Sequence, residues 1–401
     1  MALQVFCSGT PYEIGQHHGR KAHAQVRSSL SFYTGLFAKA CSLSWLGVRG
    51  EAQSYLEHLE RSCPRYVEEM RGVADGVNAA SAGDQNGAHD NALDLLDIVA
   101  LNVRSEIVFG LFTDHSNGVN GKGRVQDPPM DGCTSVGLVA GDDAAPGHTY
   151  LAQNWDWFVG QRENLIVLHI SSSNSEKSLP DIIMVTEAGI IGKIGFNSAG
   201  VGICQNAIRA RGVDVASGRL PVHLAMRRVL ESWSCSEAVQ ALTATGVAGS
   251  VYLLVGDGHD ESRRVSGIEC TSTSVKEIGL SPPSPDSAVN MLAHTNHLLL
   301  EHAGVDEPSW LADSDPRVQR IQRLVDQMHK QGQKTQAKQY SEKLFELFKD
   351  EEGYPMSINR REIGQSTSET LFTIVMDLTA KKALVTFGRP SAFVDRVDLA
   401  F

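Results

Sequence analysis

The 401-residue sequence lacks any apolar run close to the roughly 18–20 residues that a membrane-spanning helix needs. Its first eight residues, MALQVFCS, lack the basic start and the long apolar core of a secretion signal. The last three residues, LAF, do not form the SKL-type tripeptide that addresses proteins to peroxisomes. From these absences we expect a cytoplasmic protein.

Paired cysteines and nucleotide-binding loops are also missing. The seven cysteines are odd in number, scattered and without a CxxC pair, which suits a reducing compartment and suggests no zinc cluster. No GxGxxG or P-loop motif stands between a strand and a helix, so nucleotide binding is not indicated. A formal net charge of −11 argues against nucleic acid as the main partner.

The periodicity of apolar residues divides the chain into two parts. Residues 9–110 read as helical and open with a capping box at Thr10, which Pro11 follows at the first helical position. On the last of these helices we expect the polar residues Asn102, Arg104 and Glu106 to form an exposed stripe, with the alternative that one of them faces the active site. The predicted helices cover residues 14–40, 51–62, 66–80 and 93–109.

From Cys133 onward the period changes to two, which is typical of strands. This alternation of strands and helices predicts an α+β protein whose sheets carry helices on their outer faces. The predicted strands cover residues 133–140, 150–154, 165–171, 182–187, 190–196, 200–206, 250–255, 264–270, 274–278, 289–293, 371–377 and 382–387. Helices are predicted over residues 221–232, 235–243, 308–331 and 336–350.

Cys133 stands where a Gly-, Asn- and Pro-rich run, residues 113–130, gives way to a buried strand. A backbone cut before Cys133 would leave an α-amine with a pKa of about 7.7–8.0, which can act as a base toward its own thiol. That is the arrangement of an N-terminal-nucleophile enzyme. From the residues alone, a buried structural cysteine at the start of a strand is the commoner case.

Other polar residues lie at the ends of predicted strands and turns. Asp156 ends the strand that forms a hairpin with the Cys133 strand, so its carboxylate is placed to accept from a new α-amine. Asn296 can supply amide N–H donors to an oxyanion. Arg360 follows a proline turn, and a guanidinium near a thiol favours the thiolate. Ser250 opens a strand. Each residue also fits an ordinary role as a cap, a turn residue or a surface charge.

Three histidines, His294, His297 and His302, raise two alternatives. A metal site is disfavoured because their spacing lacks the HExxH pattern and no nearby carboxylate completes it, so we expect no metal. A papain-like site would use Cys133 as nucleophile and His294 or His297 as base. The papain-type flank around the cysteine is absent, which leaves this as a minority alternative.

Seven stretches together resemble the acyl-coenzyme A:6-aminopenicillanate (isopenicillin N) acyltransferase family of the N-terminal-nucleophile hydrolase superfamily. They occur in family order from about residue 1 to about residue 390. The DGCT, QNWD and TEAGIIGK runs are the specific ones. The stretches are GTPYEIGQHHG (9–19), LNVRSE (101–106), DGCTS (131–135), QNWDWF (153–158), TEAGIIGKIGFNSAGVGI (186–203), HTNH (294–297) and YPMSI with Arg360 (354–360).

The resemblance implies an αββα four-layer sandwich and a precursor that cuts itself between Gly132 and Cys133. It implies a nucleophile at Cys133, an oxyanion donor at Asn296 and a serine tied to processing and activity at Ser250. The remaining matches are Asp156, Arg360, the weaker site amide Asn206, and the substrate-binding positions Trp157 and Ser357.

The chain differs from the family pattern at three places. The turn at 141–147 is longer than expected, Trp157 replaces the usual Phe of the acyl pocket, and the peroxisomal tail is missing. The last two differences argue against a role in penicillin synthesis and leave the cysteine chemistry untouched. We therefore expect a compact or aromatic acyl group, because the bulk of Trp157 leaves less room for a long chain.

The resemblance thus predicts a self-processing amidohydrolase or acyltransferase of secondary metabolism. The segments 1–132 and 133–401 would stay together as a heterodimer within one compact domain. The substrate would be a small N-acyl amide or an acyl-CoA, and no cofactor, nucleic acid or membrane is expected. The alternative from another class is an unprocessed, inactive scaffold that binds acylated small molecules.

Overall fold

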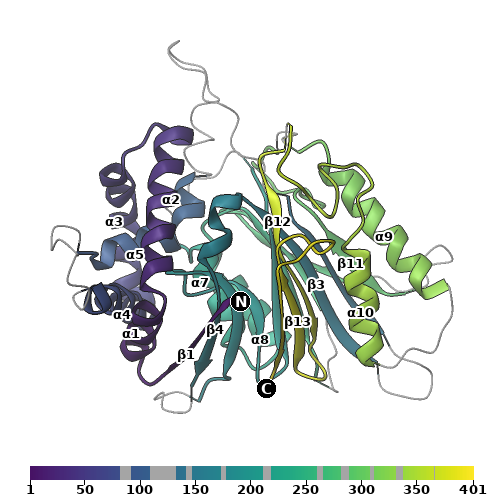
Figure 1. Ribbon diagram of the computed structural model, residues 1–401, viewed down its shortest axis with the longest axis horizontal. Helices are drawn as coiled ribbons and strands as arrows, with labels where there is room; N and C mark the ends of the chain where they lie inside the picture. Colours follow the sequence, from purple (N-terminus) through teal and green to yellow (C-terminus); the bar gives the residue numbers. More distant parts are fainter. Residues whose placement is uncertain are drawn as a thin grey trace, which may run out of the picture.

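The computed structural model describes residues 1–81, 92–108, 132–140, 147–172, 178–210, 218–259, 265–280, 289–307, 311–330, 337–364 and 366–401. Within these residues the chain forms four layers, with helices outside two facing sheets (Figure 1). The αββα sandwich is therefore confirmed. The predicted loop at 113–130 lies outside the described residues, as does the turn at 141–147 except for its last residue.

One sheet has eight strands in the described part of the chain, in the order β1-β4-β5-β6-β7-β8-β9-β10. Its first pair, β1 and β4, is parallel, and the other pairs are antiparallel. The strands are β1 (Leu3–Ser8), β4 (Leu165–Ser171), β5 (Ile182–Glu187), β6 (Ile194–Asn197), β7 (Val201–Ala207), β8 (Val251–Asp257), β9 (Val265–Cys270) and β10 (Val275–Gly279).

The second sheet has six described strands, all antiparallel, in the order β11-β2-β3-β12-β13-β14. These are β11 (Met291–His294), β2 (Thr134–Ala140), β3 (His148–Trp157), β12 (Glu369–Asp377), β13 (Lys382–Phe387) and β14 (Asp395–Ala400). Side chains bond directly from sheet to sheet, because Ser135 donates to Asn206 at 2.6 Å and Gln153 accepts from the backbone of Gln205 at 2.9 Å.

Helices α9 (Ser314–Lys330) and α10 (Ala337–Leu347) cover the six-stranded sheet (Figure 1). The remaining helices pack with the eight-stranded sheet, and a buried ion pair from Arg227 to Glu69, 2.9 Å long, ties two of them together. They are α1 (Pro11–Lys21), α2 (His23–Cys41), α3 (Trp45–Ser62), α4 (Pro64–Ser81), α5 (Leu95–Asn102), α7 (Val222–Leu230) and α8 (Cys235–Thr245), with a 3₁₀ turn, η2 (Val159–Asn164), after β3.

Several expectations about elements were wrong. The helix predicted over 14–40 is two helices, because Ala22 leaves the helical conformation between α1 and α2. Strands β1 and β14 were not predicted. The stripe of Asn102, Arg104 and Glu106 is buried rather than exposed, and each of the three side chains makes at least one hydrogen bond inside the protein. None of the described helices has the length and apolarity to cross a membrane.

Candidate functional site

Cys133 lies directly before β2 and is 1% exposed. Its backbone N–H donates to Asn296 Oδ1 at 2.9 Å, and its carbonyl oxygen accepts from Arg317 Nη1 at 2.7 Å. The pairing of β11 with β2, in which His294 faces Ser135, carries the following residues of 294–297 alongside Cys133. The backbone of the predicted nucleophile is therefore held on both sides.

The orientation of the Asn296 amide follows from its partners. Its Oδ1 accepts from both Cys133 and Arg317 Nη2, the latter at 2.9 Å, while its Nδ2 donates to the carbonyl of Ala207 at 3.0 Å. Donors on one side and an acceptor on the other distinguish the oxygen from the nitrogen. The backbone N–H of Asn296 is bound by Ser314 Oγ at 2.8 Å. Arg317 and Ser314, both on α9, were not among the predicted site residues.

Asp156 is fully buried near the end of β3. Its Oδ1 accepts from Thr370 Oγ1 at 2.6 Å, and its Oδ2 lies 3.3 Å from Arg360 Nε. Burial raises the pKa of Asp156 to about 7, although the Arg360 charge acts in the opposite direction. Arg360 also pairs with Asp313. The structure thus brings two predicted residues, Asp156 and Arg360, together.

Gly132 lies against the guanidinium of Arg360. A Cβ atom at residue 132 would be 2.4 Å from Arg360 Nη2, which is closer than real contacts allow. Successive strand residues face opposite sides of a sheet. Asn154 binds the carbonyl of Phe348 at 3.0 Å, so its side chain faces α9 and α10, and Asp156, two residues further along β3, faces the same way. Thr134 pairs with Asn154 and shares this face. Cys133, one residue before Thr134, therefore faces the opposite way, into the space between the two sheets.

Trp157 at the end of β3, Tyr33 of α2, Arg104 and Glu187 of β5 form an aromatic and charged cluster. Trp157 is 7% exposed, and its Nε1 donates to Tyr33 Oη at 3.1 Å. Arg104 stacks over the Trp157 ring at 5.4 Å and pairs with Glu187 at 2.5 Å. Trp157, predicted to line an acyl pocket, is therefore held by residues of α2 and of the segment after α5.

Lys193 joins this cluster and interacts electrostatically with Cys133. Its Nζ pairs with Glu187 at 2.6 Å and lies 4.2 Å from the Trp155 ring centre. Burial lowers the pKa of Lys193 to about 8, while the charges of Glu187 and Cys133 act in the opposite direction. Lys193 belongs to the TEAGIIGK run but was not singled out as a site residue.

The other predicted residues lie around this centre in different ways. Asn206 accepts from Ser135 and donates to the carbonyl of His294 at 3.4 Å. Ser250 directly precedes β8, whose first residue pairs with Ala207, the partner of Asn296. Ser357 donates to the carbonyl of Asn359 at 2.8 Å, so its hydroxyl shapes the turn before Arg360.

The histidines have partners of their own. The His294 ring stacks on Tyr252 with 3.6 Å between centroids. His297 Nδ1 lies 2.7 Å from Ser314 Oγ, and His302 Nδ1 lies 2.7 Å from Ser274 Oγ. Among the described residues, no group of three or more His, Cys, Asp or Glu side chains is arranged to hold a metal ion.

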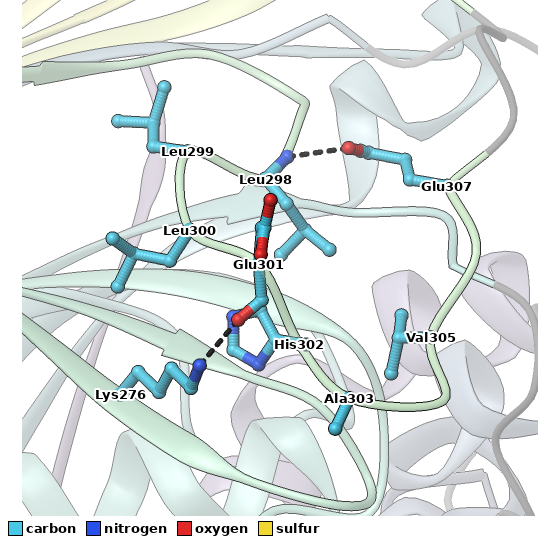
Figure 2. A pocket seen from close by; sticks show the side chains of 9 residues that line it. All are labelled: Lys276, Leu298, Leu299, Leu300, Glu301, His302, Ala303, Val305 and Glu307. Carbon is cyan, nitrogen blue, oxygen red and sulfur yellow. Dashed lines mark hydrogen bonds between the residues drawn. The ribbon is translucent and has the colours of Figure 1, made fainter.

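A cleft of about 630 Å³ is lined mainly by the loop 298–307, which follows Asn296 in the sequence (Figure 2). Three consecutive leucines, 298–300, line it together with His302 and the edge-strand residue Lys276. Glu307 accepts from the backbone of Leu298 at 2.8 Å, and burial raises its pKa to about 7. None of the residues predicted for the catalytic site lines this cleft.

The four-layer arrangement of helices and facing sheets is the one that the resemblance to the N-terminal-nucleophile hydrolases implies. Residues 143–392 match the model of the family described as acyl-coenzyme A:6-aminopenicillanic acid acyl-transferase. The chain is also 35% identical over 397 residues to the 40 kDa form of acyl-coenzyme A:6-aminopenicillanic-acid-acyltransferase of Emericella nidulans, covering 97% of this chain and 93% of that protein. The chain therefore belongs to this family of acyl-transferring enzymes.

Solved structures show weaker likeness. A variant of the conjugated bile acid hydrolase of Clostridium perfringens has 12% identity and a TM-score of 0.44, covering 66% of this chain and 92% of that chain. The Caenorhabditis elegans ortholog of N-acylethanolamine-hydrolyzing acid amidase has 17% identity and a TM-score of 0.42, covering 62% of this chain and 93% of that one. Likenesses at this level carry no argument about substrates.

Proposed function

We propose that the chain cuts itself between Gly132 and Cys133 and then acts as an acyltransferase or amidohydrolase with Cys133 as nucleophile. The observation that carries the proposal is the set of side-chain contacts to the backbone on both sides of the Gly132–Cys133 bond. Asn296 binds the Cys133 nitrogen, Arg317 binds its carbonyl, and Arg360 lies against Gly132. Buried backbone groups need partners in any protein, and here the partners are an amide and a guanidinium, which are also groups that can stabilise charge at a reacting carbonyl.

Self-cleavage would follow an N-to-S acyl shift. The Cys133 thiol adds to the Gly132 carbonyl, the C–N bond breaks, and a thioester forms while the Cys133 nitrogen takes a proton. Water then hydrolyses the thioester, which leaves a Gly132 carboxylate, a free thiol and a free α-amine. The two chains, 1–132 and 133–401, remain packed as one heterodimer.

Turnover would then use the new amine as a base. The amine takes the thiol proton, and the thiolate attacks the carbonyl of an amide or thioester. Asn296 would stabilise the oxyanion, because an amide nitrogen carries two N–H donors and the bond to Ala207 uses one of them. The acyl-enzyme passes its acyl group to water or to an amine.

The substrate class we propose is a small N-acyl amide, or an acyl-CoA as donor, in cytoplasmic secondary metabolism. The relative named above is an acyltransferase for which acyl-coenzyme A and 6-aminopenicillanic acid are the named reactants. In this chain Trp157 is fixed by Tyr33 and Arg104, so the acyl group it would meet is compact or aromatic. Faster turnover of long-chain than of aryl-acyl or short-chain amides would contradict this preference.

The test is the fate of purified protein on a denaturing gel. The parent is expected to give two chains, of residues 1–132 and 133–401, and Cys133→Ala a single intact chain. Cys204→Ala is the matched control, because Cys204 is another fully buried cysteine of the inner layers and should leave cleavage intact. Cleavage that persists in Cys133→Ala would point to an external protease, and an uncleaved, inactive parent would favour the scaffold.

A further inference from the structure

Arg317 contacts the backbone of Cys133, and the role inferred for it rests on the proposed function. It lies in the first turn of α9 and is 2% exposed. Its guanidinium donates to the Cys133 carbonyl at 2.7 Å, to Thr134 Oγ1 at 3.2 Å and to Asn296 Oδ1 at 2.9 Å. We propose that Arg317 is a positioning residue that holds Asn296 on the Cys133 nitrogen and keeps that nitrogen uncharged in the cleaved enzyme.

The geometry around Asn296 Oδ1 carries the electrostatic part of this proposal. The Cys133 nitrogen and Arg317 Nη2 each lie 2.9 Å from this one oxygen. The two nitrogens are therefore at most about 6 Å apart, within the range over which a like charge disfavours ionisation. After cleavage the Cys133 nitrogen is an α-amine, which must be neutral to accept the thiol proton. The guanidinium charge favours that neutral form.

Nearby charges moderate this effect without cancelling it. Asp313 accepts from Arg317 Nε at 2.7 Å, but it also pairs with Arg360, so one carboxylate serves two cations. Burial raises the pKa of Asp313, yet Arg317 and Arg360 outweigh it and hold this pKa below its ordinary value. Among the residues that the structure describes, other charged or titratable groups near the Cys133 backbone and side chain are Asp156 on the outer face and Lys193 with its partner Glu187 on the inner face. His297 also lies near, 2.7 Å from Ser314 Oγ, and burial lowers its pKa.

An arginine at this position has two separable properties. Its planar fork reaches acceptors on Cys133, Thr134 and Asn296 at once, which the single ammonium of a lysine does not reproduce. Its positive charge is shared by lysine. Arg317→Lys therefore removes the fork and keeps the charge, whereas Arg317→Met removes both.

The experiment measures the pH dependence of kcat/KM for each variant. Each variant is made by co-expressing residues 1–132 with residues 133–401, so that its kinetics do not depend on self-cleavage. Removal of the initiator methionine from the second chain exposes the α-amine of Cys133 in the same two-chain complex. We expect the acid limb of the Arg317→Met profile to move upward by about one pH unit. The Arg317→Lys limb should stay in place while kcat falls. A Met limb that coincides with the parent limb would overturn the proposal.

Two controls sharpen the result. Arg320, three residues further along α9, pairs with Asp350 at 2.7 Å, so Arg320→Met removes a cation from the same helix and should leave the limb unmoved. Arg317→Gln gives a second neutral variant should the methionine complex fail to assemble.

A further measurement separates the amine from Asp156, whose pKa the Arg317 charge also lowers. Titration of ¹³C-labelled cysteine by NMR should show the shift at residue 133 itself, and an unshifted amine would overturn the proposal. Undiminished turnover in a Cys133→Ala complex would instead refute the proposed function, whatever the Arg317 variants show.

Discussion

At the scale of single residues, the amide of Asn296 has two ends with different tasks. Its oxygen binds the Cys133 nitrogen, and its nitrogen is the end available to an oxyanion. Asn296→Asp keeps the acceptor and removes the donors, so it should lose roughly 10²–10³ in kcat, as does the loss of one oxyanion-hole donor. Asn296→Ala should lose at least as much. Kinetics of mature enzyme that show near-normal turnover in the Asp variant would move the role elsewhere, with Asn206 next.

Gly132 is the second residue where a small change has a clear consequence. The guanidinium that a Cβ at residue 132 would strike is held by Asp156 and Asp313 and cannot simply swing away. Gly132→Ala should therefore slow self-cleavage by at least about tenfold, since a shift of the scissile carbonyl misaligns it with the thiol. A time course on denaturing gels measures the rate. Gly279→Ala, where a Cβ meets open space, is the control. Equal cleavage rates in the two variants would show that the junction adapts.

The candidate site was predictable only in part. Cys133, Asp156 and Arg360 stand out in sequence because each follows a turn or ends a strand beside a glycine, tryptophan or proline motif. Arg317 has no such context. It lies in an amphipathic helix among other charged residues, and its burial depends on how α9 packs on β2 and β11. Helical periodicity alone does not distinguish an arginine facing the solvent from one facing a buried backbone carbonyl.

At the scale of elements, local pattern located most strands and helices, and tertiary contacts decided the exceptions. The sequence 14–40 has no proline or glycine pair that would announce the break at Ala22 between α1 and α2. Strand β1 lies at the edge of its sheet, and its apolar Phe6 is exposed and stacks on His169 of β4. The exposed phenylalanine interrupts the expected alternation of apolar and polar residues, so the sequence does not distinguish this strand from an unstructured terminus. The charged residues after α5 were expected outside because burial of charge is rare without partners.

Glu106 offers a test of that buried stretch. Its Oε1 accepts from the backbone N–H of Val222 at 2.6 Å, and burial raises its pKa to about 7. Because this pKa is above the value of about 4.3 in an unfolded chain, the native state binds the proton more tightly. Its contribution to stability is therefore complete below about pH 4 and is lost as the pH rises to about 7.

Glu106→Gln has no such ionisation. Its stability relative to the parent should rise between about pH 4 and pH 7, by up to about 3 kcal/mol. Denaturant unfolding of both proteins at several pH values measures the difference. Ile107→Val, at the neighbouring buried apolar residue, changes no ionisable group, serves as the control and should give a difference that is independent of pH. A pH-independent difference for Glu106→Gln would mean that the carboxyl group titrates normally.

At the scale of the whole molecule, the proposed cut divides the chain but not the core. Strand β1 pairs with β4 from Leu3 beside Ile166 to Ser8 beside Ser171, so the first segment supplies a strand to the sheet of the second. The pairs Glu69–Arg227 and Arg104–Glu187 also join the two segments and are almost fully buried. One hydrophobic cluster contains residues from both sides of the junction.

These contacts predict that the mature chains separate only when the protein unfolds. Salt at about 1 M screens exposed charges within about 3 Å but leaves buried pairs and apolar contacts largely intact. The cleaved protein should therefore elute from gel filtration as one species in high salt while giving two bands on a denaturing gel. Val5→Asp, at a β1 residue that is 1% exposed, should lower the unfolding midpoint of the complex, whereas Gln4→Asp on the exposed side of the same strand should change it little. Separate elution of the two chains in high salt would mean that the heterodimer rests on exposed charges instead of a shared core.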